Sequence, residues 1–216
     1  MNEVLSAIRD AYLLAAASAA ELLDDPAVAN LWSKPSALES FTVSALAGHL
    51  ASQVLNVART IKAPPPQGEL VSLVGHYGRV LWIDADVDAE INVSIRQGGE
   101  RHASDGAALL AAQVKAAVEE VRALLATEPA DRVVEPPAGP WGLLLDDFLI
   151  TRMMEISVHS DDLAYSVGID SPALPPSVLE PVLSLLTSLA VRRHGASAVL
   201  RALTRAERAP QLINAF

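Results

Sequence analysis

Apolar residues recur every three or four positions along most of this chain, which is the spacing of helices with one buried face. The clearest example follows Ser104 or Asp105, either of which suits the N-cap position, and runs to about Ala126. Its apolar positions are Leu109, Leu110, Val114, Val118, Val121 and Leu125. The same pattern predicts further helices over about 4–24, 43–61, 143–167 and 176–193. A last helix is expected to begin within HGAS at 194–197 and to end at about 207.

Proline, glycine and capping residues mark the ends of these segments. Thr42 is a suitable N-cap for the helix at 43–61, and APPPQG at 63–68 ends it. EPPAGP at 135–140 has the composition of a linker, and Gly168 closes the helix at 143–167.

Residues 70–101 follow no single pattern. They contain an expected helical turn and the segment INVSI, which alone passes for a short strand. The long amphipathic segments nevertheless predict an all-α protein, an up-down-type four-helix bundle with extra C-terminal helices. We expect one domain over 1–216, with the bundle core at about 1–168 and the C-terminal helices at about 175–208.

Composition narrows the function. Hydrophobic residues make up 51% of the chain and aromatic residues only 4%, so the core must be aliphatic. A formal net charge of −10 argues against a nucleic-acid partner, because phosphate binding requires clustered Lys and Arg. No apolar run is long enough to span a bilayer, and the N-terminus has no basic segment before an apolar block. We therefore expect a cytoplasmic protein with no membrane partner.

The absence of cysteine restricts the chemistry further. The chain has no disulfide, no thiolate metal ligand and no thiol nucleophile of its own. Any bound metal must therefore be held by His and carboxylate side chains, and any reacting thiol must come from a small molecule.

An unusual polar stripe runs through the apolar segment RMMEISVHSDDLAYSVG at 152–168. Glu155 and His159 are four residues apart and lie on the same helix face, together with Asp162, while Arg152 lies at its edge. A buried carboxylate beside a buried imidazole must be paired, neutral or bound to a metal, since an isolated charge there costs several kcal/mol.

A third candidate comes from the helix at 43–61. His49 shares a stripe with Gln53 and Asn56, and bundle metal sites use inward side chains from facing helices. His49, Glu155 and His159 together would supply two nitrogens and one oxygen, which is the ligand set of catalytic zinc with one open position. Nickel or ferrous iron accepts the same set.

Each of these residues also has a purely structural interpretation. Glu155 and His159 suit an ordinary ion pair, Asp162 suits either a partner of His159 or a simple helix-end acid, and Arg152 suits either an ion pair or a substrate carboxylate. The other histidines lie in less regular or basic stretches, and we expect them at the surface. They are His76, His102 and His194.

Two segments resemble the mycothiol-dependent maleylpyruvate isomerase N-terminal family, which is placed within the DinB-like metal-binding bundles. WSKPSALESFTVSALAGHLASQVLN resembles the family's opening, in which Trp and Pro-Ser precede a Thr-Val-x-x-Leu-x-x-His-Leu helix start. LLLDDFLITRMMEISVHSDDLAYSVG resembles its second signature, Arg-x-x-Glu-x-x-x-His-x-x-Asp-Leu-Ala, which ends in Gly. The tail HGASAVLRALTRAERAPQLINAF is also similar to that of many members.

The resemblance implies a DinB-like bundle that binds a divalent metal, most simply zinc, through His49, Glu155 and His159. It also implies a low-molecular-weight thiol such as mycothiol, which the metal brings to a small electrophilic substrate. Arg152, Gln53 and Asn56 are candidates to position the thiol or the substrate.

Two functions of different classes follow from these residues. The first is a metal-dependent transferase or isomerase that uses the thiol. The second is a non-catalytic bundle that binds a metal or small ligand in a stress or sensing role, and a purely structural bundle is a third possibility. The sequence leaves the oligomeric state open.

Overall fold

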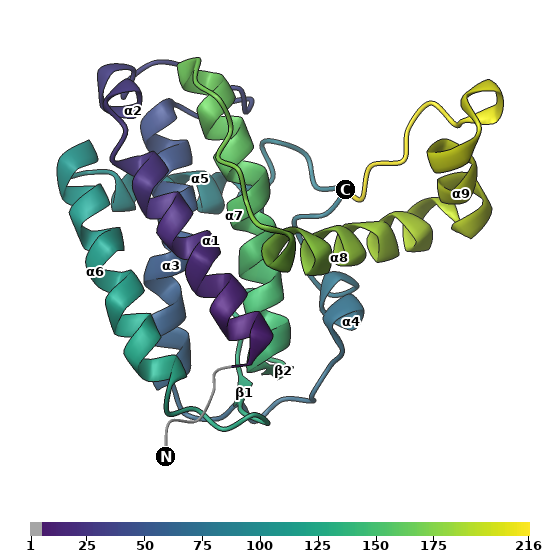
Figure 1. Ribbon diagram of the computed structural model, residues 1–216, viewed down its shortest axis with the longest axis horizontal. Helices are drawn as coiled ribbons and strands as arrows, with labels where there is room; N and C mark the ends of the chain where they lie inside the picture. Colours follow the sequence, from purple (N-terminus) through teal and green to yellow (C-terminus); the bar gives the residue numbers. More distant parts are fainter. Residues whose placement is uncertain (1–5) are drawn as a thin grey trace.

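The computed structural model describes residues 6–216, so positions 4 and 5 of the first predicted helix lie outside the described part. Long helices pack side by side as a bundle (Figure 1). They are α1 (Ala7–Leu23), α3 (Val43–Lys62), α6 (Ala107–Leu125) and α7 (Leu145–Val167). The predicted all-α bundle with extra C-terminal helices is confirmed.

Small side chains allow these helices to approach closely. Ala15, Ala16 and Ala19 of α1 are completely buried, and Tyr12 lies among them with its hydroxyl donating to the main-chain oxygen of Gln53 in α3 at 3.1 Å. Burial of this aliphatic surface is the main stabilising contribution in a chain with so few aromatic residues.

Capping residues place the helix starts and ends close to the predicted positions. The Thr42 hydroxyl accepts from the main-chain N–H of Ala45 at 3.1 Å, which confirms it as the N-cap of α3. Gly168 ends α7 in the left-handed conformation, with φ of 74°, where glycine is favoured because it has no Cβ. The predicted cap of α6 was wrong, since Gly106 precedes Ala107 and no side chain caps this helix.

A helix that the sequence left undefined covers one side of α3. INVSI belongs to α5 (Glu90–His102) and is not a strand. α5 packs along α3 with Gly99 against the α3 backbone. A Cβ at Gly99 would lie 2.2 Å from the Ala45 main-chain oxygen, so this close approach requires glycine. Tertiary packing, rather than helix propensity, thus determines the structure of this segment.

Short elements complete the connections. They are α2 (Pro26–Asn30), α4 (Leu73–Tyr77) and the antiparallel pair β1 (Val133–Val134) and β2 (Leu143–Leu144). EPPAGP therefore connects two paired strands, and α7 begins two residues later than predicted.

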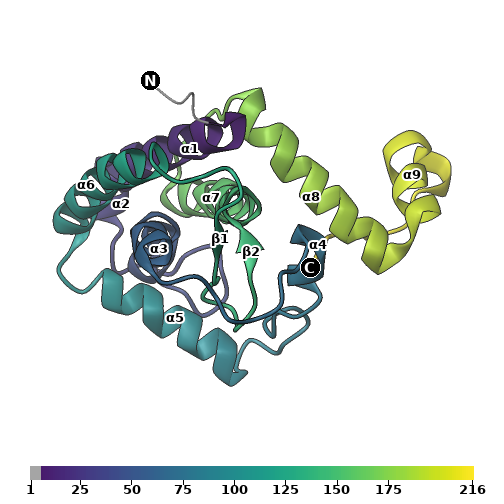
Figure 2. The same cartoon turned by 90° about the horizontal axis from the view of Figure 1, so that it is seen from below.

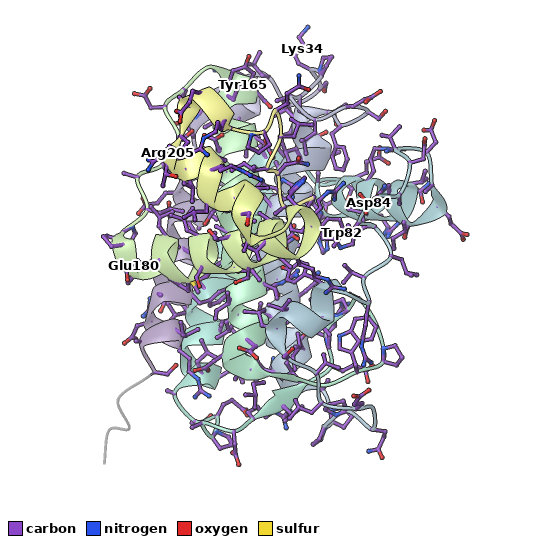
Figure 3. All side chains as sticks on the ribbon, turned by 90° about the vertical axis from the view of Figure 1, so that its right-hand side faces the viewer. Lys34, Trp82, Asp84, Tyr165, Glu180 and Arg205 are labelled. Atoms are coloured by element: carbon purple, nitrogen blue, oxygen red, sulfur yellow. The ribbon has the colours of Figure 1, made fainter. Side chains whose placement is uncertain are left out.

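The last helices leave the bundle. α8 (Pro176–His194) crosses α7 at a steep angle, and α9 (Ala196–Thr204) lies at its far end, away from the bundle (Figures 1 and 2). A short 3-10 helix, Ala206–Arg208, follows, and the chain then returns toward α4. Figure 3 shows Trp82 and Asp84 on this side of the molecule, and Asp84 accepts from the Arg193 guanidinium of α8 at 2.6 Å.

A buried ionic contact joins the lower ends of the bundle helices. Arg9 is 5% exposed, and its side chain donates to the Asp146 carboxylate of α7 at 3.0 Å. It also donates to the main-chain oxygens of Glu128 and Pro129 beyond α6, at 2.6 and 2.7 Å. One guanidinium therefore ties α1, α6 and α7 together.

Among residues 6–216, no helix combines the length and apolar character that crossing a bilayer requires.

Candidate metal centre

Three candidate ligands from two distant segments converge between α3 and α7, which lie side by side in Figure 2. His49 comes from α3, and Glu155 and His159 come from successive turns of α7. One ligand atom from each residue lies within 4.8 Å of the other two. The predicted grouping of these three side chains is therefore present in the structure.

The spacing of these atoms suits a tetrahedral cation. Glu155 Oε2 lies 3.5 Å from His49 Nε2 and 3.2 Å from His159 Nε2. A zinc ion with bonds of about 2.0–2.1 Å separates its tetrahedral ligand atoms by roughly 3.4 Å. Two imidazole nitrogens and one carboxylate oxygen thus fit zinc, and a fourth position is left for an exogenous ligand.

The charges within this cluster are strongly coupled. Burial would raise the pKa of Glu155, but hydrogen bonds from His159 and His49 outweigh it and hold that pKa well below its usual value. Burial would likewise lower the pKa of His159, yet its contacts with Asp162 and Glu155 raise it to about 9. Burial dominates at His49 and lowers its pKa. The Glu155 carboxyl, whose pKa is lowered, thus lies between two imidazoles whose pKa values shift in opposite directions.

Asp162 orients the second histidine. Its Oδ2 lies 3.0 Å from His159 Nδ1, one helical turn further along α7. A proton on Nδ1 shared with this carboxylate leaves His159 Nε2 free to coordinate a cation, which is the usual arrangement around a metal-bound histidine. Of the two interpretations of Asp162, the structure supports the one in which it is a partner of His159.

The candidate ligands lie at the wall of a cavity of about 900 Å³. One side is apolar and includes Phe41, Trp82 and Phe216, while α3 and α5 contribute arginines and amides. Among residues 6–216, Glu155 supplies the only carboxylate side chain of its lining, although the whole chain has a net charge of −10. Burial, together with the positive charges of Arg59 and Arg101, lowers the pKa of His102. The cavity therefore favours a ligand with anionic character.

The other predicted binding residues also line this cavity. Arg152 donates from Nη1 to Gln53 Oε1 at 2.5 Å, and its guanidinium lies 5.3 Å from the centre of the Phe148 ring. Gln53 in turn donates to the main-chain oxygen of His49 at 3.0 Å, and Asn56 lies further along α3. Arg152 forms no ion pair with a described carboxylate, so its structural ion-pair interpretation was wrong.

Comparison with known protein families gives one decisive match. The family described as mycothiol maleylpyruvate isomerase N-terminal domain matches residues 12–164, well over half of the chain. The chain belongs to this family. The matched segment contains all three candidate ligands and ends within α7, so α8 and α9 lie beyond it. Comparisons with curated proteins and with solved structures gave no match.

The sequence led to a wrong prediction for the location of one histidine. His76 was predicted at the surface, but it is 3% exposed and lines the same cavity as the candidate ligands. Its Nδ1 accepts a hydrogen bond from the Trp141 indole N–H at 3.0 Å. The apolar run around it in α4, LVGHY, was the available signal of burial. His102 also lines the cavity, whereas His194 lies outside it and contacts the Asn214 main-chain oxygen at 2.8 Å.

The burial of His76 predicts a loss of stability in acid. Burial lowers its pKa from 6.5 to about 4. Between pH 6.5 and 4 the His76 imidazole is therefore protonated in the unfolded chain and neutral in the folded chain. The free energy of unfolding is unaffected by this group above pH 6.5 and decreases as the pH falls toward 4. His76→Gln should flatten the fall in unfolding free energy over this range by roughly 1–3 kcal/mol. Urea unfolding at several pH values measures this slope, and identical slopes in both proteins would contradict it.

Proposed function

We propose that this protein is a divalent-metal-dependent enzyme that uses a low-molecular-weight thiol, mycothiol or a close analogue, in a transferase or isomerase reaction on a small electrophile. The observation that carries the proposal is the convergence of His49, Glu155 and His159, whose ligand atoms lie within 4.8 Å of one another at the wall of a large cavity. Zinc fits this donor set best, and nickel or iron is also compatible.

The bound metal would lower the pKa of a thiol that occupies its open position, so that the thiolate is present at neutral pH. The thiol must be exogenous because the chain contains no cysteine. Two neutral imidazoles and one carboxylate leave a net charge of about +1 on a divalent centre, which favours an anionic sulfur ligand.

The surrounding residues would hold the thiol and the substrate. Arg152 has a fixed position because Gln53 and the Phe148 ring both contact its guanidinium. It supplies positive charge to the cavity and forms no ion pair with a carboxylate among the described residues. Gln53 and Asn56 offer amide groups on the same helix as His49 for the polar parts of the thiol.

Thermal unfolding in the presence of mycothiol tests this function. Mycothiol should raise the unfolding temperature of the zinc-loaded protein and leave that of the zinc-free protein unchanged, because the sulfur binds through the metal. Mycothiol disulfide is the matched control, since it keeps the sugar groups and lacks a free thiol.

The alternative, a non-catalytic metal- or ligand-binding bundle, predicts zinc binding with no response to mycothiol. Equal stabilisation by mycothiol and its disulfide would contradict thiol coordination. Failure to bind zinc, nickel or iron would remove every metal-dependent function and leave a structural or small-ligand-binding helical domain.

A substitution of Asp162 is expected to weaken zinc binding at the same centre without abolishing it. Asp162→Asn should lower zinc affinity by roughly 10- to 100-fold, because the amide supports the required His159 tautomer less well. The neighbouring Asp161 is the matched control, since its carboxylate is exposed and bonds to the Ser171 hydroxyl. Competition with a chromogenic zinc chelator measures both variants. Equal affinities for the Asp161→Asn and Asp162→Asn proteins would contradict the role assigned to Asp162.

A further inference from the structure

His76 is a buried cavity residue that the candidate metal centre does not use. It comes from α4 and faces the cavity from a different element than the ligands on α3 and α7. Its recorded hydrogen bond and ring contacts are with Trp141 and Tyr77 rather than with the candidate ligands, although the charges of Arg152 and Glu155 both act on it. It is therefore a separate functional group at the same cavity.

The hydrogen bond from Trp141 fixes which ring nitrogen of His76 is protonated. An indole N–H can only donate, so Nδ1, which accepts it at 3.0 Å, must present its lone pair. In a neutral imidazole the proton then lies on Nε2. The T-shaped contacts of the ring with Tyr77 and Trp141 hold its orientation. The ring is thus held in one tautomer and one plane.

The Nε2–H of this ring is available to a ligand. Nε2 forms no hydrogen bond with the described residues and is not among their fully buried, unpartnered side-chain atoms. Because the residue as a whole is 3% exposed and lines the cavity, this N–H is open to the cavity rather than to the outer surface. Burial also keeps the pKa of His76 near 4, so the ring is neutral at physiological pH.

The charge of the cavity indicates what this donor would bind. Its lining contains Arg59, Arg101 and Arg152, and in the part of the chain that the structure describes Glu155 is its only acidic side chain. An oxygen that bears negative charge is attracted by these guanidinium groups and accepts a hydrogen bond from a neutral N–H more strongly than a neutral oxygen does. A carboxylate is the simplest group of this kind on a small substrate.

We infer that His76 donates a fixed Nε2–H hydrogen bond to an anionic oxygen of the bound substrate, and that Trp141 is the positioning residue that keeps the proton on Nε2. This assignment rests on the proposed function in taking the cavity as the substrate site. It adds a second anchoring point, distinct from the metal, and restricts the substrate to electrophiles that carry such an oxygen.

Nitrogen-15 NMR of histidine-labelled protein, with acetate as the probe, tests the inference. The His76 signals, assigned by their loss in His76→Phe, should show the Nε2–H tautomer from pH 5.5 to 8. Acetate should shift the Nε2–H signal saturably, with and without zinc. His76→Phe should weaken acetate binding by about tenfold or more, because it keeps a ring and loses the donor. In Trp141→Phe the proton should distribute between both nitrogens.

His194 is an internal control in the same spectra, because its Nε2 contacts a main-chain oxygen outside the cavity and should not respond to acetate. His76→Gln, which places an amide N–H near the position of Nε2, should retain part of the acetate affinity. An Nδ1–H tautomer, or acetate titration without a shift at His76, would overturn the assignment. Failure of the zinc or mycothiol experiments would instead remove the proposed function, since the tautomer and acetate measurements are also made on the zinc-free protein.

Discussion

Replacing His159 with alanine is expected to abolish stoichiometric zinc binding while the helix content is retained. Structural zinc sites bind with about 10–16 kcal/mol shared among their ligands, so the loss of one imidazole should weaken affinity by roughly 100-fold or more. His159 also lies at the cavity wall rather than in the core, with 17% of its side chain exposed, so its removal leaves the bundle packing intact. Metal analysis after dialysis, together with circular dichroism, measures both quantities.

The matched control for this variant is His102→Ala. His102 lines the same cavity and lies outside the group of candidate ligands, so its loss should leave one zinc ion per chain. Full zinc content in the His159→Ala protein would contradict the proposed ligand set. Equal losses in the two variants would indicate general disruption of the cavity instead.

Replacing Gly99 with alanine is expected to destabilise the protein by about 3 kcal/mol and to displace α5 from α3, because overpacking at a close contact forces the backbone apart. A Cβ at Gly99 would lie 2.2 Å from the Ala45 main-chain oxygen and 3.1 Å from the His49 main-chain nitrogen. Neither atom belongs to a flexible side chain, so the helix itself must move. Since α5 forms one wall of the cavity, mycothiol binding should weaken at the same time.

The adjacent Gly98 provides the control, because both residues lie in α5 and only one contacts α3. A Cβ at Gly98 would meet nothing closer than the Arg101 guanidinium at 3.7 Å. Gly98→Ala should therefore raise stability by about 0.5–1 kcal/mol through the better helix propensity of alanine. Urea unfolding of the two variants gives the comparison, and similar stabilities would show that the α3–α5 contact is less close than described.

The same glycines explain why sequence reasoning found the bundle and missed α5. The bundle helices have long apolar stripes and clear caps such as Thr42, and both signals are local. α5 contains Gly98 and Gly99, which weaken a helix when it is considered alone. Its stability comes from the contact of Gly99 with α3, about fifty residues away in sequence, and no local pattern reports that contact.

The candidate metal centre was more predictable than its surroundings. Glu155, His159 and Asp162 are fixed relative to one another by the geometry of one helix. His49 was identified from its polar stripe on the helix at 43–61, and the resemblance to the family implied the same ligand. The burial of His76 depends instead on Trp141, which comes from the connection between β1 and β2, about 65 residues away in sequence. Arg152 likewise contacts Gln53 rather than an acid because α3, not another charged segment, packs against it.

The central claim is that His49, Glu155 and His159 hold a cation whose open position accepts a thiol sulfur. Zinc-edge X-ray absorption on the zinc-loaded protein, recorded before and after addition of mycothiol, tests it most directly. We expect only nitrogen and oxygen neighbours of zinc at about 2.0–2.2 Å at first, and one sulfur neighbour at about 2.3 Å once mycothiol is present. A spectrum that mycothiol leaves unchanged would contradict it.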